Sequence, residues 1–159
     1  MKSPLLLTLA LFAVPVMAAG PTLSPAEQAA VFKAAGAVQR GTLWMMCEDE
    51  PNPGGATIDS VADLNGDGQP EVIVTEGGTF CYGRSEMGYA LVSRQPNGGW
   101  KRITSGAGIP QVLKTRGTAG WPDLSIGGPG FCFPVERWNG REYVLNRHEY
   151  EGKPCRPPQ

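Results

Sequence analysis

Short apolar runs separated by polar and glycine-rich segments fill most of the chain beyond residue 57. Runs such as Val72–Thr75 and Tyr89–Ser93 combine apolar and β-branched residues and are short, which predicts strands. Asn-Gly pairs at 97–98 and 139–140 each stand between two runs and predict hairpin turns. The 22 glycines and 15 prolines are spread between the runs, as expected for many turns. The pattern therefore predicts a mainly β fold.

One segment, at about residues 24–39, has the pattern of a helix. Ser24 suits the N-cap, Pro25 suits the first turn, and Glu27 completes a capping box. Three apolar residues then share one face of the expected helix: Val31, Ala35 and Val38. The sequence predicts an α+β fold in which this single N-terminal helix precedes the strands.

Two further apolar segments are ambiguous. Residues 42–47, TLWMMC, suit either a strand or one more helical turn. Residues 109–116, IPQVLKTR, suit a short helix.

The two β-rich parts of the chain resemble each other. GQPEVIVTEGGTFCYG at 68–83 aligns with GWPDLSIGGPGFCFP at 120–134 through Gly-x-Pro-acid, a glycine pair and Phe-Cys-aromatic. We interpret this as an internal duplication of a small β-meander that buries its face against a neighbour; shared turn chemistry in unrelated segments is the alternative. We expect one sheet unit at about 58–104 and a second at about 115–150.

The first residues have the pattern of a secretory signal peptide, because Lys2 precedes an apolar run and small residues. We expect cleavage after Ala18, one β-rich domain over residues 19–159, and no membrane span in the mature chain. The expected location is periplasmic or secreted. The formal charge of −1 becomes −2 when Lys2 is removed, which does not favour nucleic acid as a partner.

Four cysteines follow the predicted signal peptide, and an even number in an exported chain indicates two disulfides. We prefer the pairs Cys47–Cys81 and Cys132–Cys155, since each ties a terminal segment to the nearer sheet unit. The main alternative joins Cys81 to Cys132 across the two units. A redox-active site is not expected, because the chain lacks a C-x-x-C motif.

The loop DLNGDGQPE, residues 63–71, spaces its oxygen-bearing residues as calcium requires. Gly68 at the sixth position permits a sharp turn. Val74 stands where an EF-hand has its bidentate glutamate, so the loop is not an EF-hand. The expected donors are four side chains and one backbone carbonyl: Asp63, Asn65, Asp67 and Glu71, with the carbonyl of Gln69. A metal-free Asx-rich turn and a catalytic metal are the alternatives.

The pattern D-x-N-x-D-G-x-x-E followed by an apolar strand resembles the calcium loops of FG-GAP and VCBS repeats, in a small exported bacterial form. These repeats are the blades of β-propellers like that of the integrin α-chain. The resemblance implies a structural calcium ion on the five donors named above, and two units that resemble propeller blades. A propeller needs several blades. The chain offers two, so a homo-oligomer that completes a larger β assembly is an alternative.

The second unit departs from the calcium pattern. Thr115, Gly117 and Ala119 align with the first three metal ligands and offer no carboxylate. We expect this turn to form without an ion.

The sequence does not present a nucleophile with a base and an orienting group. We therefore expect a non-catalytic binding or interaction module with an unknown protein or glycan ligand. Two segments are the expected surfaces: residues 127–134 together with Trp121, and residues 75–89. The four tryptophans suit ligand stacking or core packing, and His148 suits a surface or strand position.

Two other functions remain open. A carboxylate-dependent hydrolase of cell-wall or surface polysaccharide would use residues such as Glu71, Glu76 or Asp123. The other function is that of an inhibitor or immunity partner of a secreted toxin. The composition of the chain does not distinguish this function from that of a binding module.

Overall fold

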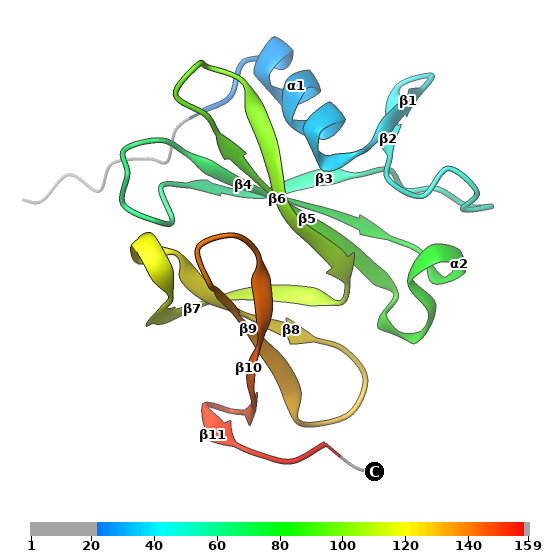
Figure 1. Ribbon diagram of the computed structural model, residues 1–159. Coiled ribbons are helices and arrows are strands. Elements are labelled where there is room, and N and C mark those ends of the chain that lie inside the picture. The colour runs from blue at the N-terminus through cyan, green and yellow to red at the C-terminus, as the bar shows by residue number, and fades with distance from the viewer. Residues whose placement is uncertain (1–21, 158–159) are drawn as a thin grey trace, which may run out of the picture.

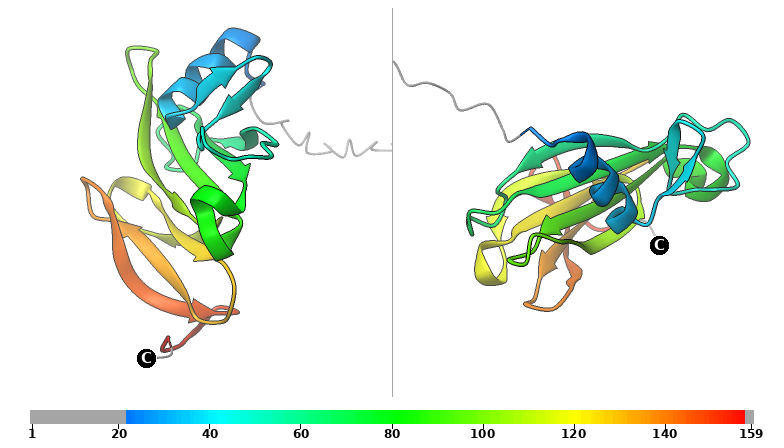
Figure 2. Two further views of the ribbon diagram at one scale, coloured as in Figure 1. Left: turned by 90° about the vertical axis from the view of Figure 1, so that its right-hand side faces the viewer. Right: turned by 90° about the horizontal axis from the view of Figure 1, so that it is seen from above.

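The computed structural model describes residues 22–157, and the predicted signal peptide lies outside the described residues. Three layers stack on one another: helix α1 with a small hairpin, a first sheet and a second sheet (Figure 1). A view from the side has the second sheet on the face of the first sheet that is turned away from α1 (Figure 2). The fold is mainly β, as predicted. Within residues 22–157, no helix is both long and apolar enough to cross a membrane.

Helix α1 spans Pro25–Ala35 and begins with the predicted capping box. The Ser24 hydroxyl accepts the Glu27 N–H at 3.3 Å, and the Glu27 carboxylate accepts the Ser24 N–H at 2.9 Å. The helix ends before the predicted residue 39, because Gly36 adopts a left-handed conformation with φ of 91°. Val38 is therefore outside the helix and begins strand β1.

The small hairpin pairs β1 (Val38–Arg40) with β2 (Leu43–Met45), so the ambiguous segment 42–47 contains a strand. Trp44 of this hairpin stacks on Phe32 of α1, with ring centroids 5.6 Å apart. Three short helical turns lie elsewhere in the described residues: α2 (Thr79–Tyr82), η1 (Gly83–Ser85) and η2 (Thr118–Gly120). The prediction of a single helix missed α2.

The first sheet is an antiparallel meander with the order β3-β4-β5-β6. Its central strand β4 is buried on both faces: Val72 and Val74 pack in the cluster under α1, and Ile73 packs in the cluster between the sheets. This double burial explains the continuous apolar run in the sequence. The four strands are β3 (Thr57–Ala62), β4 (Glu71–Gly77), β5 (Met87–Arg94) and β6 (Trp100–Ala107).

The second sheet is a meander with the order β11-β10-β9-β8-β7. Residues 109–116 form strand β7, so the helical interpretation of this segment was wrong. The segment pairs with the next strand, β8, over Ile109–Val112 and again at Arg116, and this pairing decides a pattern that was ambiguous locally. The second unit therefore begins at 109, before the predicted 115. Its strands are β7 (Ile109–Arg116), β8 (Pro122–Gly127), β9 (Phe133–Trp138), β10 (Tyr143–Tyr150) and β11 (Lys153–Pro154).

Both predicted disulfides are present. Cys47 bonds to Cys81 and Cys132 bonds to Cys155, with Cα–Cα distances of 6.0 and 5.6 Å. The first disulfide ties the segment after β2 to α2, and the second ties the segment after β11 to the loop between β8 and β9. Each bond holds a terminal segment on its nearer sheet.

Candidate metal and ligand sites

The acidic loop, residues 63–70, connects β3 to β4 and is held by its own side chains. Asp63 accepts the N–H groups of Gly66 and Gly68 on its two carboxylate oxygens, at 2.8 and 2.9 Å. Asn65 accepts the N–H of Asp67 at 2.9 Å. These contacts curl the loop back on itself, with its oxygen-bearing side chains on one short turn.

Asp67 continues the same series of contacts. Its Oδ1 accepts the N–H of Gln69 at 2.7 Å, and its Oδ2 accepts the amide of Asn65 at 3.2 Å. Three of the predicted ligand residues, at positions 63, 65 and 67, are therefore neighbours within one turn. Every oxygen that accepts one N–H group retains a second lone pair.

Glu71 fastens the acidic loop to the first sheet. Its Oε2 accepts the N–H of Leu64 at 2.8 Å, and its Oε1 accepts the hydroxyl of Ser93 at 2.8 Å. The side chain is buried, and this burial raises the pKa of the Glu71 carboxyl in spite of the two hydrogen bonds. A buried carboxylate at the start of β4 thus positions the loop.

The donor chemistry of the loop suits calcium, because every predicted ligand is an oxygen. The side-chain arrangement is more open than a closed metal cage. Within residues 22–157, no three Asp, Glu, His or Cys side chains lie close enough together to hold an ion. Glu71 turns toward Leu64 and Ser93, whereas Asp63 and Asp67 bind the backbone of the loop.

The second sheet has a different arrangement at the equivalent position. Asp123, which aligns with Glu71, is fully buried and receives two hydrogen bonds from Arg137, at 2.8 and 2.9 Å. Arg147 and Thr115 each donate one more, at 2.7 and 2.6 Å. Burial would raise the pKa of the Asp123 carboxyl, but the hydrogen bonds from the two arginines and Thr115 hold it well below its usual range. Cations of the chain itself therefore neutralise this acid.

The acidic loop also contacts the second sheet. Arg116 of β7 donates from Nη1 to the carbonyl of Leu64 at 2.7 Å. Gly120 lies against the carbonyl of Asn65 so closely that a Cβ atom at this position would collide with it. The turn η2 and the acidic loop therefore pack as one structure, although they come from different sheets.

A groove of about 440 Å³, here the inter-sheet groove, lies beside this contact. The rings of Trp121 and Trp138 stand 5.4 Å apart along it. Trp121 is only 8 % exposed, so it serves mainly as core, as the packing interpretation of the tryptophans predicted. The polar and charged groups that line the groove include Asn65, Asp67, Gln95, Lys101 and Arg141.

No protein-family model, curated protein or solved structure matches the chain. The resemblance of the acidic loop to FG-GAP and VCBS repeats therefore stays a hypothesis based on its motif.

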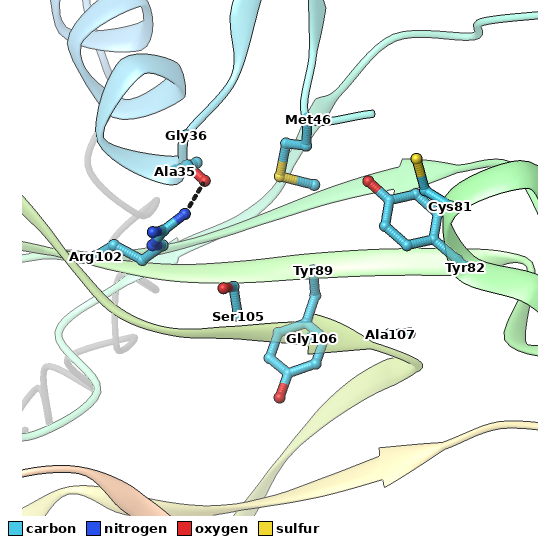
Figure 3. A pocket seen from close by; sticks show the side chains of 10 residues that line it. All are labelled: Ala35, Gly36, Met46, Cys81, Tyr82, Tyr89, Arg102, Ser105, Gly106 and Ala107. Carbon is cyan, nitrogen blue, oxygen red and sulfur yellow. Dashed lines mark hydrogen bonds between the residues drawn. The ribbon is translucent and has the colours of Figure 1, made fainter. Parts of the chain in front are cut away.

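A smaller hollow of about 290 Å³ lies at the end of α1 and includes part of the predicted 75–89 surface (Figure 3). Arg102 extends toward the helix and donates to the carbonyl of Ala35 at 3.2 Å. A cation at this place stabilises the helix C-terminus. Tyr82 also lines the hollow, and its hydroxyl donates to Glu76 at 2.6 Å. The main polar groups of this hollow thus already serve the fold.

The three carboxylates considered for hydrolysis all act as buried anchors. Glu71 and Asp123 bind the donors described above. Glu76 accepts the N–H groups of Met46 and Cys47, at 3.1 and 2.7 Å, together with the Tyr82 hydroxyl. None of the three lines the inter-sheet groove or the hollow of Figure 3.

Sequence reasoning missed the cations of the site. Arg137 and Arg147 reach Asp123 from β9 and β10, and Arg116 reaches the acidic loop from β7. Their roles depend on the pairing register of the second sheet. One signal was available, since the second copy of the predicted repeat keeps an acid at 123 but lacks the predicted calcium ligands before it.

Proposed function

We propose that the protein is an exported, non-catalytic binding module that holds a glycan in the inter-sheet groove. The observation that carries this proposal is the composite wall of the groove, to which the acidic loop contributes Asn65 and Asp67 and the second sheet contributes Trp121 and Trp138. Its volume of about 440 Å³ is in the range of small-ligand sites.

The polarity of the groove favours a sugar over an apolar ligand. Sugar hydroxyls both donate and accept hydrogen bonds. The groove offers acceptors at Asn65 and Asp67 and cationic donors at Lys101 and Arg141, next to the ring of Trp138. A few polar groups beside an aromatic surface are the usual means of orienting a small ligand.

Calcium has a structural role in this proposal. The donors are the side chains of Asp63, Asn65, Asp67 and Glu71 with the carbonyl of Gln69, and the ion fixes the acidic loop as a wall of the groove. The short turn that already gathers positions 63, 65 and 67 supports this assignment.

The two sheets support the proposal of an internal duplication of blade-like units. β3 to β6 and β7 to β10 have the same antiparallel order, and a buried acid lies at the first position of β4 and at the second position of β8. A periplasmic or secreted location fits the two disulfides, which persist in oxidising compartments. A homo-oligomer that completes a larger β assembly is compatible with the two-unit chain.

An array of immobilised oligosaccharides, followed by a tryptophan-fluorescence titration with a bound oligosaccharide, tests the glycan proposal. We expect Lys101→Ala and Arg141→Ala each to weaken binding roughly tenfold, because each removes a charge-assisted hydrogen bond. Arg84→Ala is the matched control, since Arg84 is exposed in η1, at the opposite end of β4 from the acidic loop. The proposal fails if no oligosaccharide binds, or if the groove variants bind as tightly as the control.

A further inference from the structure

The second sheet is strongly curved, and its concave face is turned away from the first sheet. Two strands, β8 and β9, lie between β7 and β10 in the sheet order, yet Thr115 of β7 and Arg147 of β10 are joined by a hydrogen bond of 3.2 Å. The curvature leaves a hollow of about 480 Å³, here called the cup, on this face. Its lining combines polar, acidic and aromatic side chains: Gln111, Ser125, Phe133, Glu149, Tyr150 and Glu151.

The charged residues that line the cup are both acids. Arg147 lies behind Glu149, where its Nε donates to the Oε1 of that carboxylate and its Nη1 donates to Asp123. The cation is thus held between two carboxylates of the protein. Because Arg137 and Arg147 together offset the charges of Asp123 and Glu149, the exposed Glu151 is the main source of negative charge at the cup, and Oε2 of Glu149 is a further acceptor for a cationic ligand.

Aromatic rings stand next to these carboxylates. The ring centroids of Phe133 and Tyr150 are 6.1 Å apart, and Phe131 meets Tyr150 edge to face at 5.1 Å. Phe131 is 73 % exposed, which is unusual for a phenylalanine that only supports packing. Aromatic faces beside carboxylates are the combination that recognises organic ammonium and guanidinium groups.

The rim of the cup is fixed before any ligand arrives. Cys132 stands between Phe131 and Phe133, and its disulfide to Cys155 crosses to the segment after β11. The N–H of Cys155 also donates to the carbonyl of His148 at 3.1 Å. Such pre-organisation lowers the entropy cost of binding.

We propose that the cup binds an organic cation, an ammonium or guanidinium group on a short aliphatic stem. The charged end lies between Glu149 and Glu151, and the stem lies on the rings of Phe133 and Tyr150. This site is separate from the inter-sheet groove, and it includes Phe133 of the 127–134 segment that the sequence indicated as a surface. The cation belongs either to a side chain of a partner polypeptide or to a free diamine.

Matched small probes test the cup through the backbone amide shifts of the ¹⁵N-labelled mature protein. Nα-acetylarginine amide and Nα-acetylcitrulline amide have nearly the same shape and differ in charge. We expect the arginine probe to shift the amides of Gln111, Ser125 and Gly152 and to bind at least about tenfold more tightly than citrulline, the effect of a charge-assisted hydrogen bond. Putrescine distinguishes the sources: tighter binding of putrescine identifies a free diamine, and tighter binding of the arginine probe identifies a side chain.

Isosteric variants give the second readout. We expect Glu149→Gln and Glu151→Gln to weaken binding of the preferred cation severalfold or more, while their melting curves confirm that they fold. Glu142→Gln is the control, because Glu142 is exposed in the turn at the opposite end of β10. Three results would each overturn the proposal: equal binding of the arginine and citrulline probes, shifts confined to residues outside the cup, or no shifts with any cation at about 10 mM. A dissociation constant of about 10 mM corresponds to roughly −3 kcal/mol of binding free energy.

Discussion

At the scale of single residues, the two buried acids Glu71 and Asp123 are stabilised by different kinds of hydrogen-bond donor. A carboxylate removed from water must be matched by donors or cations. Glu71 is matched by a hydroxyl and one backbone N–H, whereas Asp123 is matched by two arginines and Thr115. Glu71 is thus held by uncharged donors, whereas the second arrangement already contains its cations.

Asp123→Asn tests the second arrangement. The variant keeps the shape of the side chain but leaves Arg137 without its carboxylate and Arg147 with Glu149 alone. We expect the free energy of unfolding to fall by about 2–4 kcal/mol, toward the lower side of values for broken buried ion pairs because both arginines are partly exposed. Urea unfolding at pH 7 measures this loss, with Asp59→Asn as an exposed control.

The same residue predicts a dependence on pH. The pKa of Asp123 is lowered in the folded state, so its contribution to stability is present above the unfolded pKa of about 4 and is lost as the pH falls below that value. Wild type should therefore lose more stability than Asp123→Asn between roughly pH 5 and pH 2. Parallel loss in both proteins would show that Asp123 is not held by its arginines.

At the scale of elements, local signals identified those parts of the fold that local chemistry determines. Ser24 and Glu27 correctly identified the start of α1. The helix ends at Ala35, before Gly36, and is therefore shorter than its apolar face predicted. β7 was misjudged because its residues are mostly exposed and its pairing partner lies beyond the next turn. Pairing with another strand cannot be read from periodicity alone.

The disulfides fix two elements that pack little surface of their own. Removal of Cys132 and Cys155 together, as serines, frees β11 and the rim of the cup. The bond spans a sequence separation of 23, for which loop-closure entropy predicts a loss of about 3–4 kcal/mol.

Chemical unfolding of the double serine variant measures this loss, and the corresponding variant of Cys47 and Cys81, with a separation of 34, should lose a similar amount. Unchanged midpoints in both variants would mean that the bonds contribute little to stability.

At the scale of the whole molecule, the sequence predicted two sheet units and the pairing of the cysteines, and the structure has both. It did not predict how the sheets stack, which places Trp121, Leu124 and Ile126 against Ile73 and Leu91. Nor did it predict the groove beside the acidic loop. The stacking depends on apolar contacts between the two sheets, and the groove lies where Arg116 and Gly120 meet a loop far away in sequence; such long-range contacts leave no periodic signal.

The contact between loop and second sheet gives calcium a global effect in our account. An ion that fixes the acidic loop also fixes the surface against which η2 packs, so it should raise the stability of both sheets together. Glu71→Gln is the informative variant, because a glutamine can still accept one of the two hydrogen bonds but loses the charge that attracts calcium. Without calcium it should unfold within about 1 kcal/mol of wild type, the scale of one hydrogen bond.

The most direct measurement of the central claim is the unfolding midpoint of the mature protein in calcium and in chelator, with magnesium as the control ion. We predict that calcium at a hundredfold excess over its dissociation constant raises the unfolding free energy of wild type by about 2.7 kcal/mol. Glu71→Gln and Asp67→Asn should lose most of this increment. Equal midpoints for wild type in calcium and in chelator would contradict the account, because the acidic loop would then be a turn held by its own hydrogen bonds.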